Sequence, residues 1–326
     1  MNIPDPETVW LVGGVLAVLA VATGIAQILK RRLDTGLNPA LVGQFHLRLR
    51  AWWLMCTVLA VAFFFGRIPT VVLFGLISFW ALREYITLTP TRRGDHRALF
   101  WVFFVFTPVQ YLLVAWLDPP AWLGQEWAES LFYVTLPVFA FLFITSRVAW
   151  AGDAKRFLER IAKIQAGLMI TVYCLSHAPA MLMRDLPVDA AHGVKARLLF
   201  FFVLIVQVGD AAQYLWGQLL GKHEIAAEIT SARSWEGFTG GVLTASIVGA
   251  ALWWATPFEP WEAAMLAGVS AVIGFAGGLT MSAIKRDRDV RDYGTLVVGH
   301  AGVLDRIDSI CFAAPVFYHM SRLFLQ

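Results

Sequence analysis

Charged residues are scarce in this chain. Asp, Glu, Lys and Arg make up 15% of its 326 residues, whereas hydrophobic residues make up 58% and the mean hydropathy is +0.64. A soluble domain carries about 25% charged residues, so the composition excludes a large soluble core and predicts a polytopic membrane protein. The formal net charge is only +3, which gives no reason to expect nucleic acid as a partner.

Cysteine is also rare. Cys56, Cys174 and Cys311 are far apart, and each lies in an apolar stretch. We interpret them as small buried side chains and not as a disulfide or metal set. No Ser/His/Asp or Cys/His arrangement for nucleophilic catalysis stands out either. Residues 1–8 lack the basic segment of a signal peptide, and residues 9–29 are too long for a cleavable signal, so they should remain as a membrane helix.

Long apolar runs predict an all-α fold with about ten transmembrane helices, because a helix needs about 20 apolar residues to span a bilayer. The runs lie near residues 9–29, 52–66, 69–86, 98–117, 131–146, 166–183, 197–219, 238–257, 261–281 and 307–324. The second and third runs fit either a tight hairpin or a re-entrant element. We divide the chain into N-terminal helices (1–150), an interfacial helix with middle spans (151–204) and a catalytic transmembrane region (205–326).

The distribution of basic residues orients the chain. Loops on one side of the predicted spans carry most of the 26 Lys and Arg residues, and the opposite loops are acidic. By the positive-inside rule the basic side is cytoplasmic and the N-terminus is outside, and we expect a bacterial inner membrane. Residues 154–165 are basic and amphipathic. They predict an interfacial helix in contact with anionic lipid or, alternatively, a cytoplasmic extension of the next span.

One polar island lies between the last two apolar runs. Ser282, Lys285 and Arg286 share one face of a helix that continues the ninth span. Asp305 and Asp308 lie one turn apart at the start of the last span, and Asp305 is near a helix N-terminus, where a carboxylate is favoured. Carboxylates beside Lys, Arg and glycine turns are what a metal–polyphosphate site requires. The alternative is a juxtamembrane salt-bridge loop that fixes topology.

A second polar island covers residues 209–241. Asp210 lies inside the seventh predicted span, and a carboxylate within the membrane is usually functional. The alternative is a structural hydrogen bond to a neighbouring helix. Lys222, Arg233 and Glu236 form the cytoplasmic end of this island.

Both islands resemble signatures of the phosphatidate cytidylyltransferases, also called CDP-diacylglycerol synthases. The first signature is S-x-φ-K-R, four residues, K-D-x-G, then P-x-H-G-G-φ-x-D-R-φ-D, where φ is apolar. It is matched without a gap by Ser282, Ile284, Lys285, Arg286, Asp292, Gly294, His300, Gly302, Val303, Asp305, Arg306, Ile307 and Asp308. The elements G-D-x-x-A-Y-x-x-G-R-x-x-G-K and K-K-T-W-E-G are matched by Gly209, Asp210, Tyr214, Gly217, Gly221, Lys222, Trp235, Glu236 and Gly237. The resemblance covers roughly residues 205–320, and Arg83-Glu84-Tyr85 show a further, weak similarity to the family.

Several positions depart from these signatures. Arg291 replaces a lysine and keeps its charge but not its shape. Val298 replaces a proline or glycine, and Ala301 replaces a glycine. Gln218 and Ala232 replace basic residues. The loss of two cations predicts weaker binding of the triphosphate or the lipid head group, or a shifted substrate, in a divergent member of the family.

The resemblance implies that CTP and phosphatidic acid are converted into CDP-diacylglycerol and pyrophosphate with Mg²⁺, by a homodimer among membrane lipids. The nucleophile is a phosphate monoester that is already ionised, so no general base is needed, and catalysis consists of positioning and charge neutralisation. Asp292, Asp305 and Asp308 are the expected ligands of one or two metal ions.

The remaining expected site residues bind the nucleotide. They are Ser282, Lys285, Arg286, Asp210, Lys222, Glu236 and His300. Lys285 and Arg286 also belong, with Asp305 and Asp308, to the catalytic set. For His300 the alternative is a hydrogen bond that stabilises a turn.

Two other functions remain open at this point. A CTP-dependent lipid-alcohol kinase would use the same nucleotide and metal but would need a base near its acceptor hydroxyl. A catalytically silent lipid-binding or transport homologue would be expected to lose the metal carboxylates, yet all three are present.

Overall fold

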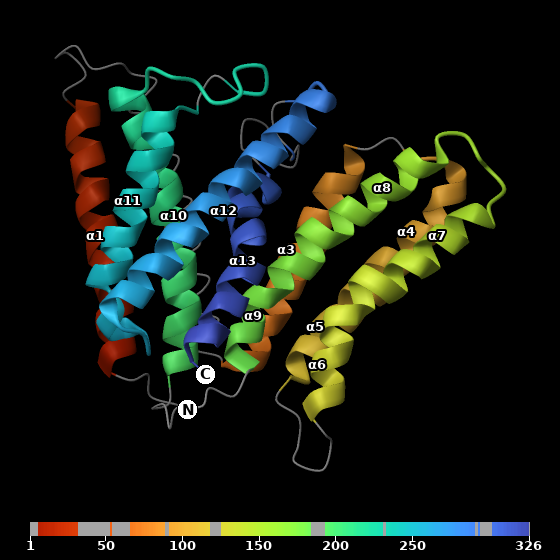
Figure 1. Cartoon of the computed structure of the whole chain (residues 1–326), viewed down its shortest axis with the longest axis horizontal. Coiled ribbons are helices and arrows are strands. Elements are labelled where there is room, and N and C mark those ends of the chain that lie inside the picture. Colours follow the sequence, from red (N-terminus) through yellow and green to blue (C-terminus); the bar gives the residue numbers. More distant parts are fainter. Residues whose placement is uncertain are drawn as a thin grey trace.

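The protein is helical throughout the part that the structure describes. The computed structural model describes residues 6–31, 53, 66–88, 91–117, 125–183, 193–230, 233–290, 293 and 302–325. Within these ranges the only β contact is an isolated antiparallel bridge between Glu224 and Ser234. The predicted all-α class is therefore confirmed (Figure 1).

Most of the long helices are uninterrupted. They are α1 (Pro6–Arg31), α3 (Arg67–Thr87), α10 (Val194–Leu220), α11 (Trp235–Ala251), α12 (Pro260–Asp287) and α13 (Leu304–Phe324). Short 3-10 turns at Arg93–Asp95 and Trp253–Ala255 precede α4 and follow α11.

Other helices pass through a π-helical turn at mid-length. The turn Val102–Phe106 joins α4 (His96–Trp101) to α5 (Thr107–Ala115), Thr135–Ala140 joins α6 (Gln125–Val134) to α7 (Phe141–Ala149), and Met169–Cys174 joins α8 (Phe157–Leu168) to α9 (Leu175–Met183). Pro108 follows the first turn and Pro137 lies in the second. A proline has no N–H for the helical ladder, which is a common cause of such a local change in winding.

Six segments of the described chain are long and apolar enough to cross a membrane. They are Arg67–Thr87, Arg93–Ala115, Trp127–Ala149, Phe157–Met183, Val194–Leu220 and Pro260–Asp287. The structure therefore supports a polytopic helical membrane protein, but not the predicted count of ten. α11 has only 17 residues, and the apolar part of α1 is a shorter stretch. Residues 54–65 of the second predicted run lie outside the described residues.

The predicted interfacial helix at residues 154–165 is not a separate element. α8 begins after Arg156, whose backbone is left-handed with φ 50°, and runs without a break into the span that ends at Met183. Ile161 and Ile164 are buried against the protein, whereas Leu158 on the first turn is 78% exposed, so most of the apolar face of the stretch packs on neighbouring helices. The alternative, an extension of the next span, is the one that the structure shows.

α13 lies at the centre of the bundle. α12 packs on one side of it with α10 and α11, and α9 packs on the other side with α3 (Figure 1). A methyl group added at Gly209 of α10 would lie 3.2 Å from Cβ of Ala271 in α12 and 3.6 Å from Cβ of Ala245 in α11. Small residues at such crossings let membrane helices approach closely. The two polar islands are thus carried by helices that touch.

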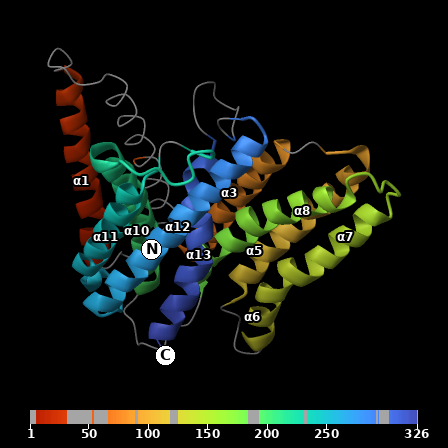
Figure 2. The same cartoon turned by 45° about the horizontal axis from the view of Figure 1, so that its top comes forward.

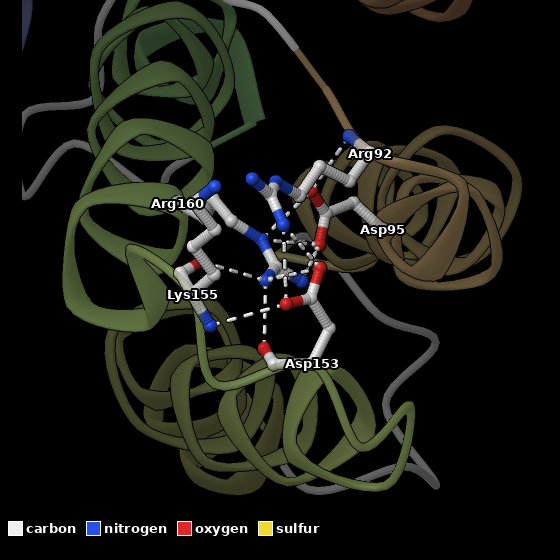
Figure 3. Close-up of polar contacts among 5 residues, drawn as sticks. All are labelled: Arg92, Asp95, Asp153, Lys155 and Arg160. Atoms are coloured by element: carbon white, nitrogen blue, oxygen red, sulfur yellow. Dashed lines mark hydrogen bonds and ion pairs between the residues drawn. The ribbon is translucent and has the colours of Figure 1, made fainter.

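A group of charged residues ties the segment before α4 to the start of α8 (Figure 3). The side chains of Arg160 and Asp95 are 5% and 1% exposed, and Arg160 Nε donates to both carboxylate oxygens of Asp95 at 3.0 Å. Arg160 Nη1 donates to the carbonyl oxygens of Asp153 at 2.8 Å and Lys155 at 3.1 Å. Arg92 pairs with Asp153 at 2.8 Å. These contacts saturate the buried guanidinium.

Loss of one partner from this group should destabilise the fold. The Asp95→Ala variant removes the buried carboxylate of Arg160 and leaves it only the more exposed Asp153 carboxylate at 3.3 Å, which should cost about 2–3 kcal/mol of unfolding free energy. The midpoint of thermal unfolding in detergent should fall. Arg92→Ala is the matched control, because Arg92 is 38% exposed and its loss should lower the midpoint less. Equal effects of the two variants would contradict the buried pair as the main contributor.

Candidate functional site

The last two turns of α12 carry the predicted Ser282, Lys285 and Arg286. α12 begins with Pro260 in its first turn and ends with Lys285 and Arg286, where a cation is favoured near the carboxyl end of a helix. The three side chains have different partners. The Ser282 hydroxyl donates to the carbonyl of Gly278 at 2.7 Å, Lys285 pairs with Asp305, and Arg286 Nε donates to the Ile229 carbonyl at 3.0 Å.

Asp305 lies in the first turn of α13, as predicted, and is held by three donors. Lys285 Nζ lies 2.8 Å from Oδ1, and the backbone N–H groups of Tyr293 and Gly302 donate to Oδ2 at 2.8 and 3.1 Å. The Asp305 side chain is 7% exposed. Tyr293 fixes the same region, because its hydroxyl donates to the Met281 carbonyl at 2.9 Å and Lys285 Nζ lies 5.5 Å from its ring centre.

Glu84 of α3 completes this turn and was not among the predicted site residues. Its carboxylate accepts from the backbone N–H groups of Val303 at 3.1 Å and Leu304 at 2.8 Å. The side chain is 4% exposed. Two signals in the sequence pointed to it: a carboxylate inside an apolar run, and the weak family similarity at Arg83-Glu84-Tyr85.

Asp308 lies one turn beyond Asp305 in α13, and its carboxylate accepts from the N–H of Ser309 at 2.8 Å. Asp210 of α10, Arg233 and Lys285 are close enough to act on its charge. Asp210 is repulsive toward it, and the two cations are attractive. The structure therefore brings together residues separated by about a hundred positions in the sequence.

The side chain of Arg233 lies across α12 at Gly278, which has no side chain to block it. Its Nη1 donates to the Phe275 carbonyl at 3.0 Å, and its guanidinium lies 4.8 Å from the centre of the Phe275 ring. A methyl group added at Gly278 would lie 2.2 Å from Nη2 of Arg233. The absence of a side chain at Gly278 thus makes room for the guanidinium.

Lys222 and Glu236 organise the connection between α10 and α11 instead. The Glu236 carboxylate accepts from the backbone N–H groups of Lys222 at 3.1 Å and His223 at 3.3 Å, and it contacts His223 Nδ1 at 2.6 Å. The hydrogen bond with His223, followed by those with the backbone, lowers the pKa of Glu236 to about 2. The connection crosses toward the end of α12 (Figure 2), where Arg286 holds the Ile229 carbonyl.

Two predicted site residues, Asp292 and His300, lie outside the described residues. Within the described ranges, no group of three or more His, Cys, Asp or Glu side chains is arranged to hold a metal ion. Cys311 is buried, as predicted, whereas Cys174 is only partly buried; both are free, and Cys56 lies outside the described residues.

Comparisons with known proteins place these residues in a family. The profile of the cytidylyltransferase family matches residues 46–324. A protein of Escherichia coli K12 with the name uncharacterized protein YnbB is 35% identical over 311 residues, which cover 94% of this chain and 97% of that protein.

Relatives with a named activity match over a shorter length. The phosphatidate cytidylyltransferase of Haemophilus influenzae is 34% identical over 141 residues, or 40% of this chain and 46% of that enzyme. The phosphatidate cytidylyltransferase of Bacillus subtilis is 34% identical over 134 residues, or 39% of this chain and 48% of that enzyme. The chain thus aligns with just under half the length of these two enzymes. Because the family profile spans most of the sequence, this protein belongs to the cytidylyltransferase family.

Proposed function

We propose that this protein is a phosphatidate cytidylyltransferase, which converts CTP and phosphatidic acid into CDP-diacylglycerol and pyrophosphate. The observation that supports this best is the contact between the two islands: Arg286 Nε donates to the Ile229 carbonyl at 3.0 Å, and the guanidinium of Arg233 lies against α12 at Phe275 and Gly278. Carboxylates and cations gathered at one end of a membrane helix bundle suit a charged polyphosphate next to a lipid.

The proposal includes a topology. Arg288, just after α12, lies 3.9 Å from Glu159 of α8, so the candidate site and the Arg160–Asp95 pair lie at the same end of the bundle. We propose that this basic end faces the cytoplasm of a bacterial inner membrane, in a homodimer with about ten spans per chain. Residues 205–326 then form the catalytic region, after the N-terminal helices 1–150 and the middle spans 151–204.

The proposal of Mg²⁺ rests on the chemistry of the donors. Asp210 and Asp308 act on each other as like charges, and carboxylate oxygens are the ligands that Mg²⁺ prefers. Asp305 keeps acceptor capacity, because a carboxylate offers about four lone-pair sites. We propose that Asp305 and Asp308, with Asp292, hold one or two Mg²⁺ ions. When bound, Mg²⁺ supplies charge neutralisation for the triphosphate.

The chain's own residues position the reacting groups. An ionised phosphate oxygen of phosphatidic acid attacks the α-phosphorus of CTP, and the bond to the bridging oxygen breaks, so that pyrophosphate leaves with the electron pair. We propose that Lys285 and Arg286 orient the phosphates, assisted by Ser282 on the same face of α12 and by His300. Arg233 adds a cation from the second island.

We propose supporting roles for the remaining residues of the second island. Glu236 orders the segment that begins at Lys222, and the exposed Lys222 side chain is available to the nucleotide. Asp210 contributes a second negative charge near Asp308 from α10.

Radiolabelled CTP tests the reaction directly. The purified protein, phosphatidic acid vesicles and Mg²⁺ are incubated with CTP labelled either at the α or at the γ phosphorus. Label from the α position should enter lipid, and label from the γ position should leave as pyrophosphate. Transfer of γ label to a lipid alcohol would instead identify a kinase, and no transfer of either label would identify a silent homologue.

The Asp305→Asn variant should lose activity. It keeps the size of the side chain but removes the negative charge that faces Lys285, so cytidylyl transfer should fall at least about 100-fold. The initial rate of α-label transfer measures this. Glu262→Gln, in the first turn at the other end of α12, serves as the control and should transfer normally. Full activity of Asp305→Asn would contradict the metal assignment.

The Gly278→Ala variant should lower activity without lowering the stability of the fold. In Gly278→Ala the guanidinium of Arg233 must leave the Phe275 carbonyl, which a flexible side chain can do at little cost to the fold. Transfer should fall about tenfold or more, while the midpoint of thermal unfolding changes by less than about 2 °C. Gly14→Ala is the control, since nothing lies within 4 Å of the added methyl. An unchanged rate of transfer in Gly278→Ala would show that activity does not depend on the contact of Arg233 with the Phe275 carbonyl.

A further inference from the structure

We propose that Glu84 is a positioning residue of the transferase site, which holds the first turn of α13 so that Asp305 stays directed at Lys285. This inference rests on the proposed function. Glu84 belongs to α3, in the N-terminal part of the chain, and lies 220 positions before Leu304. The inference therefore gives the N-terminal helices a part in the chemistry of the C-terminal region.

Both oxygens of the Glu84 carboxylate are engaged. Oε1 accepts from the N–H of Val303 at 3.1 Å, and Oε2 accepts from the N–H of Leu304 at 2.8 Å. The indole N–H of Trp80, one turn earlier in α3, donates to Oε1 at 3.2 Å. Glu84 is only 4% exposed, so water competes little with it for these hydrogen-bond donors.

A carboxylate suits this position for two reasons. The first N–H groups of a helix have no partner within the helix, and the N-terminus carries a partial positive charge. An ionised carboxylate meets both needs. Each of its oxygens accepts a hydrogen bond from a backbone N–H, and its negative charge is attracted by the partial positive charge of the helix N-terminus. A glutamine of the same shape would present an amide N–H₂ to one of the two backbone donors and leave that donor unsatisfied.

Two carboxylates share the free N–H groups at the start of α13, and this sharing determines the direction of the Asp305 side chain. Asp305 Oδ2 takes the N–H of Gly302, and Glu84 takes the next two along the chain, from Val303 and Leu304. Because Glu84 satisfies those two donors, the Asp305 side chain is not drawn to them, and its Oδ1 stays 2.8 Å from Lys285.

The end of α3 is itself fixed. Tyr85, next to Glu84, is buried and packs on α8, where a methyl group at Gly167 would lie 2.6 Å from its ring. Leu82 and Ile86 are also buried. A carboxylate on such a rigid element can hold the turn of α13 in one place.

The test compares two carboxylates that contact opposite ends of α13. Glu129 of α6 pairs with Arg322 near the far end, so Glu129→Gln is the matched control for Glu84→Gln. Site-resolved hydrogen exchange should show lost protection in Glu84→Gln at Val303 and Leu304 and also at Tyr293 and Gly302, whose N–H groups bind Asp305. The control should keep protection at all four.

Activity gives the second readout. In Glu84→Gln we expect kcat for cytidylyl transfer to fall about 10–100-fold, with KM for CTP changed less than about threefold, since Glu84 acts through Asp305 and not on the nucleotide. Glu129→Gln should keep the wild-type kcat. Glu84→Asp, which keeps the charge but retracts it, should lie between the two and supplies the comparison if the glutamine variant is not recovered folded.

The outcomes separate this inference from the proposed function. Lost protection confined to Val303 and Leu304, with kcat unchanged, would make Glu84 a helix cap only and overturn the inference. If the wild-type protein transfers no label from CTP, the proposed function fails. Exchange at Tyr293 and Gly302 then decides alone whether Glu84 positions Asp305.

Discussion

A helix that begins in a protein interior must find acceptors for its first N–H groups, because water does not reach them and an unsatisfied buried group costs about 1–3 kcal/mol. α13 begins in this situation at the candidate site, where Leu304 is fully buried. Its first turn is served by Asp305 from the helix itself and by Glu84 from α3. These neighbouring backbone N–H groups thus bind Glu84 and Asp305, and Asp305 in turn pairs with Lys285.

Close helix packing is the second condition for the site. The islands at residues 209–241 and 282–308 meet only because α10, α11 and α12 approach within van der Waals distance at small residues. Gly209 sets one such crossing, and Gly278 leaves space in which Arg233 lies along α12. The glycines therefore act on function through geometry, since they carry no chemistry of their own.

The polar clusters at this end of the bundle differ in how their charges are balanced. The guanidinium of Arg160 has two carboxylates, Asp95 and Asp153, and two carbonyls as partners within the chain, which is the arrangement of a structural link. Asp308 instead has a second carboxylate, Asp210, and the cations Arg233 and Lys285 close enough to act on its charge. Charges of both signs gathered around one carboxylate are typical of functional sites, and this distinguishes the candidate site from the structural cluster.

The sequence by itself determined the helical membrane class, the place of Lys285 and Arg286 at the end of α12, and the place of Asp305 at the start of α13, because hydropathy and helix-end preferences act over a few residues. The capping role of Glu84 and the function of Glu236 within the α10–α11 connection depend on tertiary contacts. So does the packing of α8 on protein, which an amphipathic pattern does not distinguish from packing on lipid. These features were decided only by the tertiary structure, since a side chain's partner across 219 positions is set by how helices pack and not by local sequence.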